Sequence, residues 1–260
     1  MSSCRCEYVD INEIKKWVLA VGKIALSNQT CTSFAKKKDN SIITETDLRI
    51  EEYLIEKIMK RYPMHHILSE ESGSIGSQSD ITWIIDPIDG TRAYKSGLPI
   101  WGISIGVVLR NMPLVGVFSM PAIRQVFYGT PKMAFVNDIA MKKRNRVNMD
   151  DELTFIAVPS NAHWNFSISF PRLRSFGSTT AHLAYVTSGI ALAALTRNIS
   201  VWDIASILPM MSYTGIGLIY TSGEAFNLST LLEGAPSPYP IIAAPNVVLL
   251  EVYRRFVSLT

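Results

Sequence analysis

The sequence predicts an α+β fold of layered helices and strands in two halves, from three observations. Apolar residues recur with helical spacing near the N-terminus, an antiparallel meander of strands follows, and beyond residue 154 short strands alternate with helical patterns. Such alternation is typical of layered folds. The 260 residues, 48% of them hydrophobic, suit one large domain or two closely packed halves. We place the boundary in the charged segment 131–152, which divides the chain into 1–135 and 136–260.

The first half contains two predicted helices and a series of strands. Ile11, Ile14 and Val18 follow the spacing of an amphipathic helix that continues to Ala25. A second helix begins after Thr44-Glu45-Thr46-Asp47, which has the pattern of a capping box. The predicted strands, of which the last three form the meander, are Ile42–Ile43, His66–Leu68, Ile81–Ile85, Ile100–Leu109, Leu114–Met120 and Gln125–Gly129.

The second half combines short strands with helices. Its predicted strands are Phe155–Val158, Arg172–Phe176, Ile190–Leu195, Leu218–Tyr220 and Ile241–Ala243. Its predicted helices are Thr179–Thr187, Trp202–Tyr213 and Asn246–Val257.

Charge and hydropathy exclude several classes of function. A net charge of +3 does not indicate a nucleic-acid partner, and the basic run Lys142–Arg146 reads as a solvated loop or, alternatively, as an anion contact. The apolar stretch Ala181–Leu195 is too short to span a bilayer, and the polar residues 2–10 do not resemble a signal peptide. We therefore expect a cytoplasmic protein with neither a membrane nor a nucleic-acid partner.

The three cysteines indicate reduced thiols. Cys4, Cys6 and Cys31 are an odd number in a chain that is large enough to fold without disulfides. Cys4-x-Cys6 has no second Cys or His pair nearby, which a structural metal site would need.

The stretch WIIDPIDGTRAY, residues 83–94, carries the strongest chemical signal. Pro87 restricts Asp86 to an extended conformation, and Gly90 allows a tight turn after Asp89. The two carboxylates, together with the Ile88 carbonyl, can therefore converge on one point. Hard oxygen ligands of this kind suit Mg²⁺. If a helical turn starts at Thr91, its amides form an anion site beside the cations, which is the layout of a phosphoryl-transfer site.

Each of these features also has a purely structural interpretation. DPIDG alone fits an acidic turn that closes a strand. Thr44-x-x-Asp47 fits a helix cap, and Asp203 alone fits an N-cap. Because adjacent residues of a strand point to opposite faces, only one of Glu70 and Glu71 can face the cations, and we choose Glu70.

Five motifs in order resemble those of the inositol monophosphatase superfamily, a group of Mg²⁺-dependent, Li⁺-sensitive phosphatases. The DPIDGT elbow resembles the first signature of that superfamily. The others are Lys36 followed by Ile43-Thr44-Glu45-Thr46-Asp47, then Ser69-Glu70-Glu71-Ser72, Arg174-Ser175-Phe176-Gly177-Ser178 and Val201-Trp202-Asp203-Ile204-Ala205. The resemblance runs from about Cys31 to Ala205, and it implies a layered αβαβα sandwich of the sugar phosphatase type.

The resemblance also implies a role for each matching residue. The ligands of two to three Mg²⁺ ions would be Glu70, Asp86, the Ile88 carbonyl, Asp89 and Asp203, with Asp47 acting on a third, weaker ion through water. Glu70 and Thr91 would orient the water that attacks phosphorus. The substrate contacts would be Lys36, Asp89, Gly90, Thr91, Gly177, Ser178 and Thr179.

The sequence departs from the inositol-cleaving members at one substrate position. Those members carry an acid seven residues before the second-signature aspartate, where this chain has Thr196, followed by Arg197. A site without that acceptor discriminates less well for a polyol. The predicted activity is hydrolysis of a small phosphate monoester, such as an inositol monophosphate-like polyol phosphate. The alternative substrate is a 3'(2'),5'-bisphosphate nucleotide, whose second phosphate would meet Arg197.

A prediction of another class is a non-catalytic interaction protein that keeps this fold and uses its acids only structurally. Every candidate side-chain ligand is an acid and Thr91 is present, which favours the enzyme. The apolar meander Ile103–Val117 further predicts a homodimer.

Overall fold

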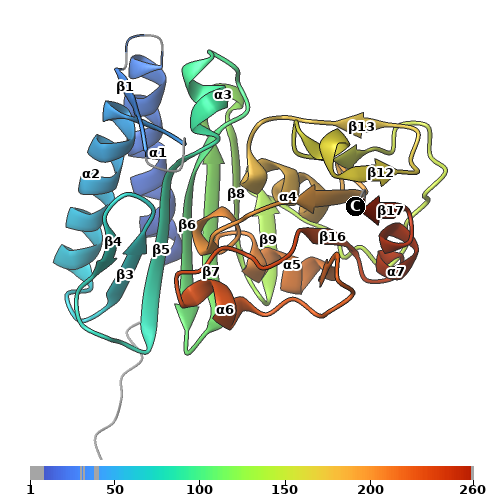
Figure 1. Ribbon diagram of the computed structural model, residues 1–260. Coiled ribbons are helices and arrows are strands. Elements are labelled where there is room, and N and C mark those ends of the chain that lie inside the picture. Colours follow the sequence, from blue (N-terminus) through green and yellow to red (C-terminus); the bar gives the residue numbers. More distant parts are fainter. Residues whose placement is uncertain (1–8, 30, 32, 38–40, 259–260) are drawn as a thin grey trace, which may run out of the picture.

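The computed structural model describes residues 9–29, 31, 33–37 and 41–258. Cys4 and Cys6 lie outside the described residues, and Cys31 is exposed. Helices and sheets alternate as five layers, which Figure 1 shows from one side of the molecule to the other. The αβαβα sandwich implied by the family resemblance is confirmed.

An eight-stranded mixed sheet forms the second layer, with the strand order β10-β9-β8-β7-β6-β5-β3-β4. All neighbours are antiparallel except β3 and β5, which are parallel. The strands are β3 (His66–Ser69), β4 (Gly73–Ile75), β5 (Ile81–Asp89), β6 (Gly102–Leu109), β7 (Met112–Met120), β8 (Gln125–Thr130), β9 (Met133–Val136) and β10 (Ile139–Ala140).

Two helices cover the outer face of this sheet (Figure 1). Helix α1 (Ile11–Asn28) begins at Asp10, whose carboxylate accepts a hydrogen bond from the Asn12 amide at 2.8 Å. Helix α2 (Glu45–Arg61) begins with the predicted capping box between Thr44 and Asp47. The apolar faces of both helices pack on Trp83, Ile85 and their neighbours in one core cluster. A short hairpin of β1 (Phe34–Lys36) and β2 (Ile42–Thr44) leads into α2.

The third layer consists of α4 (Thr179–Ser188) and α5 (Leu208–Thr214), which lie between the two sheets. Residues 180–187 of α4 are all buried, as expected of a helix covered on every side. The predicted helix Trp202–Tyr213 is instead divided into a 3₁₀ turn, η3 (Val201–Asp203), and α5. Pro209 in the first turn of α5 explains the division, because proline suits a helix start and not its interior.

The fourth layer is a five-stranded sheet with the order β13-β11-β14-β16-β15. Its strands are β11 (Ile156–Ala157), β13 (Leu173–Arg174), β14 (Ala193–Thr196), β15 (Ile216–Tyr220) and β16 (Ile241–Pro245). Helix α7 (Leu249–Tyr253) packs on its far side as the fifth layer and is much shorter than the predicted Asn246–Val257. The remaining elements are α3 (Thr91–Lys95), α6 (Leu228–Leu232), the turns η1 (Pro121–Ile123) and η2 (Ala162–Trp164), and the pair β12 (Phe166–Ile168) and β17 (Phe256–Ser258).

The predicted division at residue 135 stays a prediction. The eight-stranded sheet extends to Ala140, and the five-stranded sheet begins at Ile156. None of the helices in the described part of the chain combines the length and the apolar character that a bilayer crossing needs.

Candidate active site

A β-bulge in β5 brings Asp86 and Asp89 to the same face of the sheet. Asp86 pairs with Ser104 of β6 and Asp89 with Gly102, so three steps along β5 match two steps along β6. In a regular strand, residues three apart point to opposite faces. The extra residue of the bulge reverses that alternation, and a bulge tolerates the missing amide of Pro87. The DPID sequence thus folds as a strand defect that makes two carboxylates converge.

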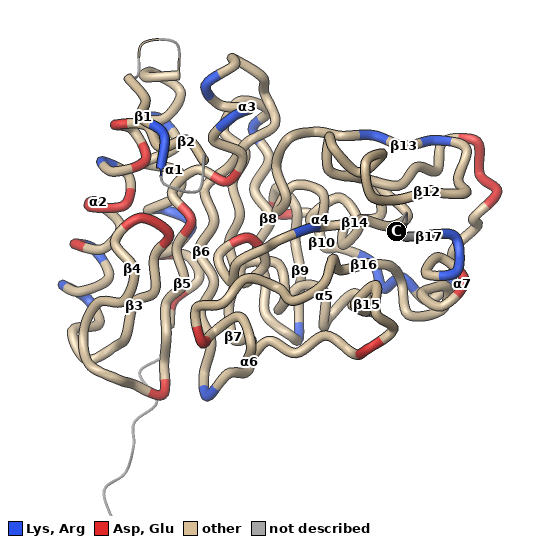
Figure 2. Tube along the Cα trace, viewed as in Figure 1, with Lys and Arg blue, Asp and Glu red and all other residues tan. Residues whose placement is uncertain are grey.

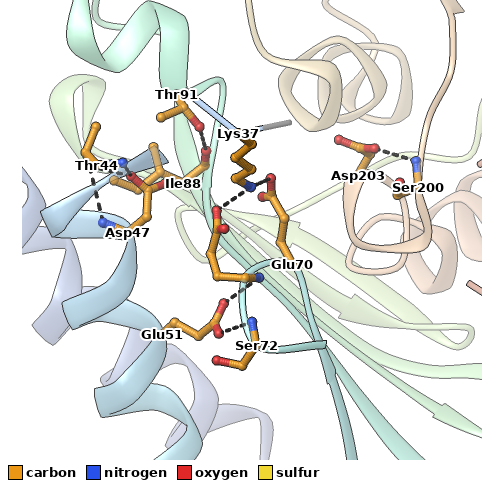
Figure 3. A network of polar contacts seen from close by, with 11 residues as sticks. Lys37, Thr44, Asp47, Glu51, Glu70, Ser72, Ile88, Thr91, Ser200 and Asp203 are labelled. Carbon is orange, nitrogen blue, oxygen red and sulfur yellow. Dashed lines mark hydrogen bonds and ion pairs between the residues drawn. The ribbon is translucent and has the colours of Figure 1, made fainter. Parts of the chain in front are cut away.

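Asp203 reaches the same point from the second half of the chain. The segment that contains η3 lies directly on β6 and β7, because two strand glycines leave room for it. A Cβ added to Gly106 would lie 2.6 Å from the Ala205 carbonyl carbon, and one added to Gly116 would lie 1.7 Å from the Ser206 carbonyl oxygen. The Asp203 carboxylate accepts a hydrogen bond from the Ser200 amide at 2.6 Å (Figure 3).

Carboxylate oxygens of Asp86, Asp89 and Asp203 lie within 4.8 Å of one another. Asp86 and Asp89 are buried, and no described group donates a hydrogen bond to Asp86 Oδ1. Burial raises the pKa of Asp86 well above its ordinary value, and the nearby Glu70, Asp89 and Asp203 carboxylates raise it further. Burial and the neighbouring acids act on the pKa of Asp203 in the same direction. A divalent cation would neutralise these buried carboxylates, which repel one another, and it would bind the oxygen of Asp86 that accepts no hydrogen bond.

Two further acids surround this cluster. Glu70 follows β3 and is close enough to Asp86 to raise its pKa by both charge and hydrogen bonding. Asp47, in the first turn of α2, is buried; its Oδ2 accepts hydrogen bonds from the Thr44 amide at 2.8 Å and from the Thr44 hydroxyl. Its Oδ1 accepts none from the described residues. Burial raises the pKa of Asp47 to about 6 against the effect of those bonds. Asp47 therefore caps α2 and still has one oxygen available.

The lysine beside the acids is Lys37. Its Nζ lies 2.9 Å from Glu70 Oε1 and 2.7 Å from Glu71 Oε1 (Figure 3). Burial lowers the pKa of Lys37, but the two carboxylates more than reverse this, so the pKa is raised overall. Lys36, the predicted substrate contact, is an exposed residue of β1, and that role stays a prediction. Glu70 and Glu71 share the lysine, while burial raises the pKa of Glu71 to about 7.

The residues after the bulge form the predicted turn into a short helix. Gly90 has φ of 87°, which only glycine adopts readily, and α3 begins at Thr91. The Thr91 hydroxyl donates to the Ile88 carbonyl at 3.0 Å, so these two predicted residues are in direct contact (Figure 3).

The N-terminus of α4 closes the other side of Asp89. The Asp89 carboxylate accepts hydrogen bonds from the Ser178 hydroxyl, from the Thr179 amide at 3.3 Å and from the Thr180 amide at 3.0 Å. Burial raises the pKa of Asp89 to about 6, although these bonds lower it. Gly177 allows the approach: its own φ is 87°, and its carbonyl would lie 3.0 Å from a Cβ added to Gly90.

A cavity of about 140 Å³ lies beside this end of α4. It is lined by Pro159, Ser160, Ser175, Gly177, Ser178, Thr179, His182, Leu195, Thr196 and Arg197, a described set without a carboxylate. Arg197 Nη1 donates to Asn165 Oδ1 at 2.5 Å. Burial lowers the pKa of His182 to about 4, so its ring is neutral at pH 7 and accepts a hydrogen bond from the Phe176 amide at 3.0 Å.

Acidic residues gather around the cluster of Asp86, Asp89 and Asp203, as Figure 2 shows in red at the turn between β3 and β4 and beside α3.

The model of one protein family, the inositol monophosphatase family, matches residues 10–230. The chain belongs to the inositol monophosphatase family. The superfamily resemblance of the five motifs is thereby confirmed.

Relatives within the inositol monophosphatase family have different names. A protein of Aquifex aeolicus named fructose-1,6-bisphosphatase/inositol-1-monophosphatase is 28% identical over 228 residues, 84% of this chain and 86% of that protein. A protein of Pasteurella multocida named Nus factor SuhB is 31% identical over 225 residues, 82% of this chain and 81% of that protein. The names of relatives thus include phosphatases, and the enzyme assignment holds at the level of the family.

Solved structures of the family have the same fold. The inositol monophosphatase of Thermotoga maritima is 25% identical, with a TM-score of 0.79 and coverage of 94% of this chain and 95% of that one. An inositol monophosphatase/NADP phosphatase solved with Mg²⁺ and phosphate has a TM-score of 0.80 at 18% identity, covering 94% and 93% of the two chains. That likeness concerns the fold.

Sequence reasoning missed several residues of this family site: Lys37, Glu51, Thr180, His182 and Ser200. Thr180 could have been identified from the sequence, because it directly follows the predicted Gly177-Ser178-Thr179 and lies at the start of a predicted helix, where amides are free to donate. Its hydroxyl also donates to the Asp203 carbonyl at 2.9 Å, which joins two candidate ligands. Lys37 gave no signal, because its partners Glu70 and Glu71 lie 33 and 34 residues away, and nothing in the local sequence marked His182 as the acceptor of the Phe176 amide.

Proposed function

We propose that this chain is a Mg²⁺-dependent phosphatase that hydrolyses a small phosphate monoester by direct attack of water. The observation that carries the proposal is the meeting of Asp86, Asp89 and Asp203, with an unpaired, buried oxygen on Asp86. Buried carboxylates are stable when they coordinate metals or are otherwise compensated. Asp86, Asp89, Asp203, Glu70 and the Ile88 carbonyl would hold two to three Mg²⁺ ions, with Asp47 beside the weakest.

When bound, Mg²⁺ lowers the pKa of a coordinated water and neutralises charge on the phosphate. The residues of the chain supply the rest. Glu70 accepts the proton of the attacking water. The Thr91 hydroxyl, which donates a hydrogen bond to the Ile88 carbonyl in this structure, orients that water. The water oxygen forms a bond to phosphorus as the ester P–O bond breaks, and the leaving alkoxide takes a proton from solvent water to become the alcohol. The Gly90 and Thr91 amides hold the phosphate.

The substrate's alcohol part would occupy the cavity at the start of α4. Gly177, Ser178 and Thr179 line it, which supports their proposed substrate contacts and favours a small molecule with hydrogen-bonding groups, such as a polyol phosphate. Arg197 on the same wall favours the second candidate, a 3'(2'),5'-bisphosphate nucleotide, because a guanidinium binds phosphate well. Further proposals are a homodimer, from the apolar meander Ile103–Val117, a cytoplasmic location, from the charge and hydropathy of the sequence, and inhibition by Li⁺, from the family resemblance.

Phosphate release tests the proposal. The purified chain would be assayed with and without Mg²⁺ on an aryl phosphate, inositol phosphate, adenosine bisphosphate, histidinol phosphate and fructose bisphosphate. We expect Mg²⁺-dependent release from at least one monoester, and Asp86→Asn as the matched control should abolish it. No release from any of them would favour a non-catalytic interaction protein, the class that the Nus factor name of some relatives brings forward.

A further inference from the structure

Glu51 is a buried carboxylate that the proposed chemistry does not use. It lies in α2, one helical turn after Asp47, and it is 1% exposed. Its Oε2 accepts a hydrogen bond from the Glu71 amide at 3.0 Å, and its Oε1 accepts one from the Ser72 amide at 2.7 Å (Figure 3). Both oxygens are therefore used, and both partners are main-chain groups of the turn between β3 and β4.

This turn is the segment that carries Glu70. The Glu70 amide donates to the Ile85 carbonyl of β5 at 3.2 Å, and the next two amides donate to Glu51. Three successive amides are thus bound from the side of β5 and α2. The backbone of the turn is fixed by these bonds, while the Glu70 side chain remains available to Lys37 and to the acidic cluster.

The position of Glu51 in α2 connects two candidate ligands. Asp47 and Glu51 are four residues apart, so they lie on the same face of the helix. Asp47 presents its unpaired oxygen from the first turn, and Glu51 binds the turn that presents Glu70. One rigid helix thereby sets the separation between Asp47 and Glu70.

Burying a carboxylate opposes folding unless it gains hydrogen bonds in return. A neutral acceptor could cap one amide, but the carboxylate accepts from two amides at once, and charged acceptors form the stronger bonds. The hydrogen bonds that Glu51 accepts fix the two residues directly after Glu70, and with them the turn that carries Glu70.

We propose that Glu51 is a positioning residue that holds Glu70 in place for divalent-cation binding. This inference rests on the proposed function, since it assumes that Glu70 is a metal ligand. Removing groups that support metal ligands typically weakens metal affinity by about 10–100-fold. We expect Glu51→Gln, which keeps the size of the side chain and one acceptor oxygen, to weaken binding by about tenfold.

The test is Mn²⁺ binding, measured by the electron paramagnetic resonance signal of the free ion, on the whole chain in the absence of substrate. The variants are Glu51→Gln, Glu51→Ala and, as a matched control, Glu52→Gln, which removes the same charge from the exposed neighbour on α2. We expect a control with wild-type affinity, a loss of about tenfold for Glu51→Gln and a larger loss for Glu51→Ala. Thermal unfolding of each metal-free variant shows whether it is folded; if Glu51→Ala does not fold, Glu51→Gln decides.

Two outcomes overturn the inference. Wild-type Mn²⁺ affinity in folded Glu51→Gln would mean that Glu51 only stabilises the turn. A loss that disappears when KCl is raised from 0.1 to 0.5 M would mean that Glu51 acts as a distant charge, because salt screens charge and leaves positioning intact. Absence of Mn²⁺ binding by the wild-type chain would instead overturn the proposed function, and the inference with it.

Discussion

The two sides of the candidate site are built differently. On the side of the eight-stranded sheet, four acids from the first half converge through one strand bulge, one turn and one helix start. On the side of α4, the second half contributes one acid, Asp203, and otherwise hydroxyls, amides and Arg197 around a cavity. The first side holds the groups for cations, and the second side holds groups for the rest of a substrate. Three of the five family motifs lie on the first side, whereas the departure from the family at Thr196 lies on the second.

Removing an acid from the first side should have the largest effect. Asp86→Asn is expected to lower kcat by at least about 10³-fold, since metals contribute several kcal/mol to transition-state stabilisation. The same change should raise the thermal stability of the metal-free chain, because it removes one of three mutually repelling carboxylates. Steady-state kinetics and calorimetry in EDTA measure the two effects. An active variant, or one that is less stable without metal, would contradict the view of this side as a cation site.

The acids should also make the stability of the metal-free chain fall as the pH rises. The pKa values of Asp47 and Asp89 are raised from 3.8 to about 6 in the folded chain, so folding favours their protonated forms. Their contribution to the free energy of unfolding is complete below pH 3.8 and is lost as the pH rises through about 6. The expected loss is on the order of 3 kcal/mol for each group, since one pKa unit corresponds to about 1.4 kcal/mol.

Thermal unfolding in EDTA between pH 4.5 and 7.5 measures this loss. Mg²⁺ should restore stability at pH 7.5 more than at pH 4.5, because metal binding displaces protons. Asp47→Asn should reduce the slope. The opposite result would be a metal-free chain whose stability rises from pH 4.5 to 7.5. It would contradict the raised pKa values of the buried carboxylates.

The contact between the two sides should be sensitive to one methyl group. Gly90→Ala is expected to cost about 2 kcal/mol or more, because it combines a left-handed φ with a Cβ 3.0 Å from the Gly177 carbonyl. Gly97→Ala is the matched control, since Gly97 has φ of 76° and no described atom within 4 Å of an added Cβ. Denaturant unfolding should show a larger loss at Gly90. Equal losses would mean that the approach of the two sides is not tight.

A change on the second side should affect substrate choice more than chemistry. Arg197→Gln is expected to raise KM for adenosine bisphosphate by about tenfold, the lower end of what a charged hydrogen bond contributes. It should leave KM for an aryl monophosphate and kcat for both substrates nearly unchanged. A parallel fall in kcat for both substrates would instead place Arg197 with the catalytic groups.

The two sides also differ in how far the sequence predicted them. The order of the motifs identified the acids, but the bulge that makes Asp86 and Asp89 converge depends on the pairing partners in β6, which the local sequence does not specify. Lys36 was assigned from its match to a family motif, whereas the ion pairs of Lys37 with Glu70 and Glu71 join residues 33 and 34 positions apart, which the local sequence does not specify. Glu51 resembled an ordinary helix acid, because its partners lie 20 and 21 residues further along the chain.

The fold was predicted more completely than the boundaries of its elements. Long periodic segments such as α1, α2 and the meander of β6 to β8 agree with their predictions. The predicted helix Trp202–Tyr213 was wrong in its boundaries, because the spacing of apolar residues is the same through the 3₁₀ turn η3 and the start of α5. That spacing does not reveal where the backbone conformation changes. The cavity near Arg197 joins residues from 159 to 197, and such an assembly follows from the packing of the second half as a whole.

The contact of Asp89 with α4 gives one carboxylate two duties. Its oxygens face the other acids and at the same time receive the first amides of a helix from the opposite half. Any sliding of that helix therefore displaces an oxygen of the cluster by a comparable amount. The positions of the carboxylates therefore depend on the packing of α4 against β5. A change that loosens this packing would displace the candidate ligands even if every acid were retained.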